Sequence, residues 1–234
     1  MQQSALTTKQ KILKQFSSFL SSRGKILLLF SIILLLAIIG IAVYSEIRAS
    51  VSEKSTILIE ELEEKYNPEA AGLNENSDEQ KKTESVESII ASLDDIIAKY
   101  SSYYAGQRAL YMKGTIYFDE KQYDKAVENF SAVADKYKKS YLAPISLHNI
   151  AVCYEELGDI DSSISYYKKI TERYSNDYPN ITHVLFSLGR LYETKEEFNT
   201  ALEYYNMLGD KYTDSDWTIF SKDRIIYLKR AGKI

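Results

Sequence analysis

The feature that most constrains the fold of this chain is an internal repeat of about 37 residues. Four segments end in a basic residue followed by a tyrosine, and another aromatic residue comes four or five positions after each tyrosine. The four tyrosines, which follow one another at this spacing, are Tyr100, Tyr137, Tyr174 and Tyr212. A fixed period of roughly 20 to 50 residues is typical of repeat proteins, in which each unit packs against its neighbours. The sequence therefore predicts an array of similar supersecondary units.

Small residues recur at two positions in each unit. Such residues allow two antiparallel helices to approach closely, and a Tyr or Phe one turn away fills the gap toward the next pair. With only 9 glycines and 3 prolines in 234 residues, the composition favours long helices over a many-turned β sandwich. We therefore predict an all-α fold, an α-solenoid of helix-turn-helix repeats. The small residues are Gly114, Ala151 and Gly189 at the first position and, twelve residues later, Ala126, Ser163 and Ala201.

Residues 105–213 resemble three full tetratricopeptide repeats. The family pattern is a large residue, then Leu-Gly, then Tyr, then Ala-x-x-x-Phe. The first repeat matches it with Leu110, Gly114, Tyr117, Ala126 and Phe130, although Lys113 replaces the Leu before the glycine. The period also exceeds the usual ~34 residues, and this longer form resembles the tetratricopeptide proteins of bacterial envelopes. The later repeats match with Leu147, Ala151, Tyr154, Ser163 and Tyr167, and with Leu185, Gly189, Tyr192, Ala201 and Tyr205.

Incomplete units flank the three repeats. Residues 88–100 align with the second helices, and we expect residues 46–66 to be their partner in a half-repeat. The segment 67–83 between them is polar and contains a proline and a glycine, which predicts a loop. Residues 217–229 begin a unit that has no second helix. They are expected to form the capping helix that a solenoid needs.

Residues 26–44 form an apolar stretch without a charge. As a helix they extend about 28 Å, at ~1.5 Å per residue, which matches a hydrocarbon core of ~30 Å. Their Leu, Ile, Val and Phe content favours membrane insertion by roughly 4–8 kcal/mol. A cleaved signal peptide is the alternative, but the stretch exceeds the usual apolar length of about 7–15 residues and lacks an Ala-x-Ala exit site. We predict a single transmembrane helix that acts as an anchor.

The charge distribution sets the expected orientation of this anchor. Residues 1–25 carry five basic and no acidic side chains, so with a net charge of −4 the rest of the chain carries −9. The positive-inside rule then places the N-terminus in the cytoplasm and the repeats on the extracytoplasmic, periplasmic side of the inner membrane. Within residues 8–22 the apolar side chains fall on one helical face, which leaves two interpretations open: a helix along the inner leaflet, or a topology signal only.

The expected organisation combines these segments. It consists of a basic cytoplasmic tail at 1–25, a transmembrane helix at 26–44, a membrane-proximal helix, loop and half-repeat at 45–104, and three repeats with a capping helix at 105–234. This layout resembles the YfgM-type ancillary subunits of the Sec translocon. The resemblance implies a helper at the translocon exit that hands emerging chains to envelope chaperones.

Catalytic chemistry finds little support in the sequence. We find no P-loop, no H-E-x-x-H motif and no serine elbow, and one cysteine with two histidines leaves little for a metal site. Adjacent carboxylates such as Glu155 and Glu156 diverge by about 100° on a helix, so we interpret them as solvated charges. We therefore expect no enzyme, no cofactor and no small-molecule substrate. The acidic remainder also argues against nucleic acid as a partner.

The first helices of the repeats carry the candidate binding residues. In the tetratricopeptide family these helices line a concave face, and the pattern implies an aromatic groove of mixed charge there. The family's clamp for a C-terminal carboxylate wants Lys and Asn where Tyr111 and Thr115 stand, so we do not expect capture of chaperone tails. A groove filled by the chain's own termini is the alternative. The candidates are Arg108, Tyr111, Thr115, Phe118, His148, Asn149, Val152, Glu155, His183, Phe186, Arg190 and Glu193.

The function favoured by the sequence is a membrane-anchored scaffold for protein–protein interactions on the extracytoplasmic side. One form of it is the translocon-associated helper, with envelope or translocon components as partners. The alternative is an adaptor that coordinates envelope assembly or cell division. An enzyme is the remote third hypothesis.

Overall fold

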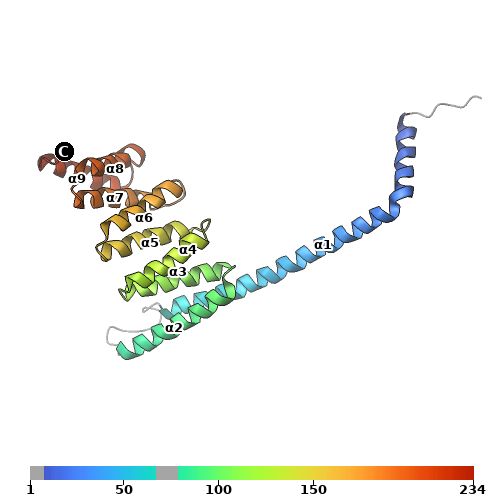
Figure 1. The fold of residues 1–234 in the computed structure, drawn as a ribbon, viewed down its shortest axis with the longest axis horizontal. Coiled ribbons are helices and arrows are strands. Elements are labelled where there is room, and N and C mark those ends of the chain that lie inside the picture. Colours follow the sequence, from blue (N-terminus) through green and yellow to red (C-terminus); the bar gives the residue numbers. More distant parts are fainter. Residues whose placement is uncertain (1–7, 67–78) are drawn as a thin grey trace, which may run out of the picture. The chain divides into compact units, whose positions relative to one another are not determined.

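The computed structural model describes residues 8–66 and 79–234, and every regular element in these residues is an α-helix (Figure 1). The all-α prediction is confirmed. The chain forms two units, Met1–Lys54 and Ser55–Ile234. The helices are α1 (Thr8–Tyr66), α2 (Glu79–Tyr100), α3 (Tyr104–Asp119), α4 (Tyr123–Lys136), α5 (Leu142–Glu156), α6 (Ile160–Arg173), α7 (Ile181–Thr194), α8 (Phe198–Lys211) and α9 (Asp216–Arg230).

The N-terminal unit contains the apolar part of α1. Among the described residues, α1 is the helix that is long and apolar enough to cross a membrane. Its side chains across residues 26–44 are exposed, including Phe30 and Ile41. A continuous exposed run of such side chains is unfavourable in water and needs a lipid or protein cover. Length and composition thus agree with a membrane span, and a signal sequence near the N-terminus shares both properties.

The second unit is a stack of helix pairs, α3 with α4, α5 with α6 and α7 with α8 (Figure 1). Within a pair the helices approach at the small residues. A Cβ added to Gly114 would lie 2.7 Å from the Phe130 ring, and one added to Gly189 would lie 2.3 Å from the Tyr205 ring. Both rings are fully buried. A glycine is therefore required where the aromatic ring of the second helix crosses the first.

The recurring tyrosines connect one inter-repeat joint to the joint before it. The Tyr137 hydroxyl donates a hydrogen bond to the Ser101 carbonyl oxygen at 2.6 Å. One repeat later, the Tyr174 hydroxyl donates to the Lys138 carbonyl oxygen at 2.9 Å. Ser101 and Lys138 lie just past the ends of α2 and α4, where carbonyl oxygens lack a partner within the helix and these hydroxyls supply one. This contact gives the physical reason for a tyrosine at the same place in successive repeats.

The N-terminal end of the stack is made by α2 and the last turns of α1. Ile59 and Leu62 of α1 share a hydrophobic core with Leu93 of α2. The expected polar loop falls into two parts: residues 67–78 lie outside the described residues, whereas residues 79–83 belong to the first turns of α2. The loop prediction was wrong for 79–83, because this Glu-, Gln- and Lys-rich segment has high helix propensity.

At the C-terminal end, α9 packs against α7 and α8. Its buried residues are Thr218, Ser221 and Leu228, and two of these three are polar. The Thr218 hydroxyl donates to the Tyr212 carbonyl oxygen at 2.5 Å. A capping helix ordinarily has a polar outer face, whereas α9 exposes four large apolar side chains. These are Ile219, Phe220, Ile226 and Tyr227.

Candidate protein-binding face

The predicted binding residues lie on α3, α5 and α7, and most of them contact the neighbouring first helix of the stack. We call this row of side chains, together with those of α9 that contact it, the first-helix face. All twelve predicted residues are in the described part of the chain. The contacts between them show which are available to a partner and which are already occupied.

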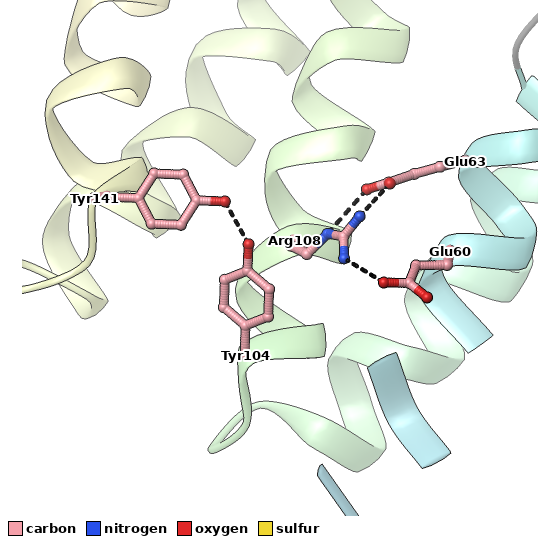
Figure 2. A network of polar contacts seen from close by, with 5 residues as sticks. All are labelled: Glu60, Glu63, Tyr104, Arg108 and Tyr141. Atoms are coloured by element: carbon pink, nitrogen blue, oxygen red, sulfur yellow. Dashed lines mark hydrogen bonds and ion pairs between the residues drawn. The ribbon is translucent and has the colours of Figure 1, made fainter. Parts of the chain in front are cut away.

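At the N-terminal end of the face, Arg108 is held by two carboxylates of α1 (Figure 2). Its Nε lies 3.1 Å from Glu63 Oε1, and a second nitrogen pairs with the other oxygen of Glu63 in a two-point contact. Another Arg108 nitrogen lies 3.4 Å from Glu60 Oε1. Because the carboxylates occupy the guanidinium fork, Arg108 is a structural clamp between α1 and α3 and not an open groove residue.

The tyrosine pair Tyr104 and Tyr141 lies beside this clamp (Figure 2). Their hydroxyl groups are hydrogen-bonded to each other across successive repeats. Burial, followed by the hydrogen bond to Tyr141, raises the pKa of Tyr104 to about 12, so this hydroxyl stays neutral at physiological pH. The Arg108 guanidinium carbon lies 5.6 Å from the Tyr104 ring centre, within the range of a cation–π contact.

In the middle of the face, polar groups of α3 and α5 pair with each other. Asn149 Nδ2 donates to the Tyr111 hydroxyl at 3.1 Å, and the Tyr111 ring lies 5.5 Å from the Phe130 ring. The Thr115 hydroxyl is turned back to the Tyr111 carbonyl oxygen of its own helix. Phe118 lies against Tyr123 at the start of α4, and Val152 is half-buried. These side chains therefore contribute mainly to packing within the helix stack and leave little surface for a partner protein.

His148 and His183 form a partly buried pair. Their ring centres are 5.0 Å apart, and His148 also lies 5.3 Å from Tyr167. Only 9% of His148 is exposed, and burial lowers its pKa to about 4, aided by the nearby His183. Treating His148 as an open groove residue was wrong, because the rings of Tyr167 and Tyr178 lie against it. Among the described residues no group of three or more His, Cys, Asp or Glu side chains is placed to hold a metal ion.

A three-residue contact occurs twice along the face. At the C-terminal end of α5, Glu155 accepts from the Tyr167 hydroxyl at 3.0 Å and pairs with Arg190 of α7. One repeat later, Glu193 accepts from the Tyr205 hydroxyl at 2.6 Å and pairs with Arg224 of α9. In each case the tyrosine follows the glutamate by twelve positions. Interpreting Glu155 as a solvated charge was wrong, since the next first helix supplies its cation.

The C-terminal end of the face is aromatic. Trp217 stacks on His183 with ring centres 4.2 Å apart, and it lies 5.1 Å from the Phe186 ring. Phe220 lies 5.6 Å from Trp217 and is 50% exposed. Arg190 and Arg224 follow Phe186 and Phe220 by four positions each, so they lie on the same helical sides as those rings. We call Phe186, Trp217, Phe220, Arg190 and Arg224 the aromatic end.

The chain's own C-terminal helix therefore contributes three residues that the sequence prediction of the face omitted: Trp217, Phe220 and Arg224. Trp217 stands at the recurrent aromatic position after a joint tyrosine, and this spacing was the available signal. Phe220 and Arg224 have no equivalent signal, because their place depends on how α9 rests against α7. The side chains of Arg190 and Arg224 are 48% and 41% exposed although both are ion-paired.

Comparison with known proteins agrees with this architecture. Residues 17–213 match the family model described as tetratricopeptide repeat-like domain, and the matched region includes the apolar stretch 26–44. A TPR repeat-containing protein of Treponema pallidum (strain Nichols) is 26% identical over 117 residues, which are 50% of this chain and 48% of that protein. The chain thus spans about half the length of this curated relative.

A solved structure shows the same fold at low sequence identity. A tetratricopeptide repeat protein from Parabacteroides merdae superposes with a TM-score of 0.52 at 19% identity, covering 70% of this chain and 57% of that one. The apo form of RapI has a TM-score of 0.47 at 19% identity, with 71% of this chain and 75% of that chain covered.

Proposed function

Because this chain belongs to the family of tetratricopeptide repeat-like domains, we propose that it is a membrane-anchored scaffold that binds other proteins on the extracytoplasmic side. The fold is typical of non-enzymatic interaction modules. The binding site in this proposal is the aromatic end of the first-helix face. Residues 26–44 are the anchor.

The observation that carries the proposal is the half-exposed ring of Phe220 within a cluster of aromatic side chains. Phe186, Trp217 and Phe220 present a rigid apolar surface that costs little conformational entropy on binding. The side chains of Arg190 and Arg224 are 48% and 41% exposed, so they place positive charge at the edge of these rings and favour an acidic group in the partner. The partner fits this site if it offers an apolar side chain next to an acidic one.

The anchor supports the proposal by raising the local concentration of partners. A domain attached to a bilayer meets membrane-side proteins at an effective concentration far above that in bulk solution. Binding at the aromatic end then needs only modest affinity. The five positive charges that precede the span favour an extracytoplasmic location for the domain.

Within this function we favour a translocon-associated helper that hands emerging chains to envelope chaperones. Apolar contacts with aromatic rings are non-directional, so such a surface accepts many partner sequences, as a helper of this kind requires. The layout of basic tail, single span and acidic repeat domain supports the same role. The second candidate is an adaptor for envelope assembly or cell division, which requires one fixed partner.

Photo-crosslinking in cells tests the proposal. The full chain carries a photoreactive amino acid either at Phe220 or at Glu203, an exposed residue on the second helix α8. We expect crosslinked envelope proteins from position 220 and not from 203. Translocon components and emerging chains among the products support the helper, whereas one recurrent assembly or division protein supports the adaptor.

A matched pair of substitutions on one helix gives the control. Phe220 and Ile226 both lie on α9 and are 50% and 49% exposed. Only Phe220 belongs to the aromatic end. With the photoreactive amino acid placed at Phe186 instead, Phe220→Ala should lower the crosslinking yield severalfold, and Ile226→Ala should not. Equal yields for both variants would move the binding site away from the aromatic end.

A further inference from the structure

The first part of α1, residues 8–22, has an apolar face. Ile12, Leu13, Phe16 and Phe19 follow the spacing i, i+1, i+4 and i+7, which places them on one side of a helix. All four are strongly exposed; Phe16, for example, is 63% exposed. Within the N-terminal unit these side chains are therefore available to another apolar surface.

The opposite face of this segment is polar and positively charged. Lys11, Gln15 and Ser18 follow the spacing i, i+4 and i+7, and Lys14 lies one turn before Ser18. Residues 8–25 contain no acidic side chain. Arg23, at the end of the segment, lies with its guanidinium carbon 5.9 Å from the Phe19 ring. Long basic side chains in this position keep their charge at a lipid surface while their stems cover apolar groups.

A bend separates this segment from the apolar span. Figure 1 shows α1 bending near its N-terminal end, in the blue part of the ribbon. The hydroxyls of Ser21 and Ser22 donate to the carbonyl oxygens of Ser18 and Phe19, at 3.0 and 3.2 Å. Gly24 follows, and no atom lies within 4 Å of where its Cβ would be. Serine back-bonding and glycine are recognised causes of helix bending, so 21–24 is suited to change the direction of the helix.

We propose that residues 8–22 form an interfacial helix that lies on the cytoplasmic leaflet and binds its anionic lipids. We infer that the bilayer covers the apolar face, because only residues 23–25 separate this helix from the membrane span at 26–44. The helix therefore emerges at the headgroup region, where its apolar side enters the acyl boundary and its lysines meet anionic headgroups. The proposal rests on the membrane anchor but not on the partner-binding face.

Spin labels on the full chain in lipid vesicles test this proposal. One label replaces Phe16 on the apolar face, a matched one replaces Ser18 on the polar face, and a third replaces Leu36 in the span. Cys153 is buried, and burial raises its thiol pKa to about 12, so it does not compete for the label at neutral pH. Collision with oxygen reports lipid contact, and collision with a water-soluble nickel complex reports water contact.

In vesicles of phosphatidylcholine with phosphatidylglycerol, we expect the oxygen-to-nickel ratio to be severalfold higher at 16 than at 18. The ratio at 16 should fall in phosphatidylcholine alone and in the double variant Lys11→Glu, Lys14→Glu. The double variant Lys138→Glu, Lys139→Glu in the repeat domain is the matched control and should leave it unchanged.

The outcomes separate this proposal from the anchor itself. Water contact at Leu36 would overturn the anchor on which both proposals depend. Lipid contact at Leu36 with equal ratios at 16 and 18 would overturn the interfacial helix alone. An oxygen-to-nickel ratio at position 16 that changes neither when phosphatidylglycerol is omitted nor in the Lys11→Glu, Lys14→Glu variant would overturn the recognition of anionic lipid.

Discussion

The substitution Gly189→Ala tests the close approach of α7 and α8. The added Cβ would lie 2.3 Å from a Tyr205 ring carbon, far inside ordinary contact distance. The ring cannot move freely, because it is fully buried and its hydroxyl is bonded to Glu193 at 2.6 Å. Moving it therefore disturbs the contact that holds Arg224 of α9.

The magnitude follows from two costs and one gain in stability. Overpacking of a buried ring costs about 1–3 kcal/mol, and weakening a hydrogen bond to a carboxylate costs about 1.5–3 kcal/mol. Replacing glycine by alanine inside a helix returns only about 1 kcal/mol. The expected net loss is therefore about 1.5–5 kcal/mol. For a domain of this size, 1 kcal/mol shifts Tm by about 2–4 °C, which predicts a fall of at least roughly 3 °C.

Gly209→Ala is the matched control. Gly209 lies near the end of α8, where no atom is within 4 Å of the added Cβ. The same chemical change should therefore leave stability unchanged or raise it by up to about 1 kcal/mol. Thermal unfolding of the full chain in detergent, followed by circular dichroism, measures both variants. A Tm for Gly189→Ala at or above that of the unmodified chain would refute the packing argument.

Three further predictions follow from burial, charge and topology. The pKa of His148 falls from 6.5 in the unfolded chain to about 4 in the folded one, so the unfolded state binds more protons in this window and stability should decline as pH falls from 6.5 toward 4. Thermal unfolding between pH 7 and 4 should show this decline, and His148→Gln should make it shallower; the pKa of His183 is also lowered, mainly by burial, so part of the decline should remain. An equally steep decline in the variant would contradict the assignment. Cys153 should react with a neutral maleimide only after denaturant is added, because its thiol is buried, and rapid labelling of the folded chain would contradict its place in the core. A reporter fused after Ile234 should behave as extracytoplasmic, whereas recovery of a soluble chain that begins near Ser45 or Ser50 would indicate a cleaved signal.

The parts of the fold that sequence reasoning found are those encoded by short, periodic spacings. Tyr137 and Tyr174 recur because each donates to a backbone oxygen in the preceding joint, so the same contact repeats at a fixed spacing. Gly114 and Gly189 are visible for a similar reason, since each accommodates a ring of its own repeat. Contacts that recur at a fixed spacing along the chain thus leave a readable pattern.

Contacts between repeats were harder to predict. Glu193 pairs with Arg224 and Glu155 pairs with Arg190, and the separation along the chain is shorter in the first pair than in the second. The separations differ because the link before α9 is shorter than the link before α7. The burial of His148 has the same origin, since Tyr178 reaches it from the segment that leads into α7. The environment of a side chain that depends on how helices of different repeats pack against each other cannot be predicted from sequence spacing alone.

The limited burial of α9 has a consequence for the binding site that we propose. Solenoids lose their terminal units first, because a terminal unit has a neighbour on one side only. Two hydroxyl side chains and one leucine of α9 are buried in its interface, and Ile225 packs half-buried against the core. We therefore expect α9 to unfold locally much faster than the whole domain unfolds. Amide hydrogen exchange should then be faster in α9 than in the other helices of the repeat array. Trp217, Phe220 and Arg224 move away together with α9, so each local unfolding event disrupts the aromatic end. A partner segment bound there should therefore slow amide hydrogen exchange in α9.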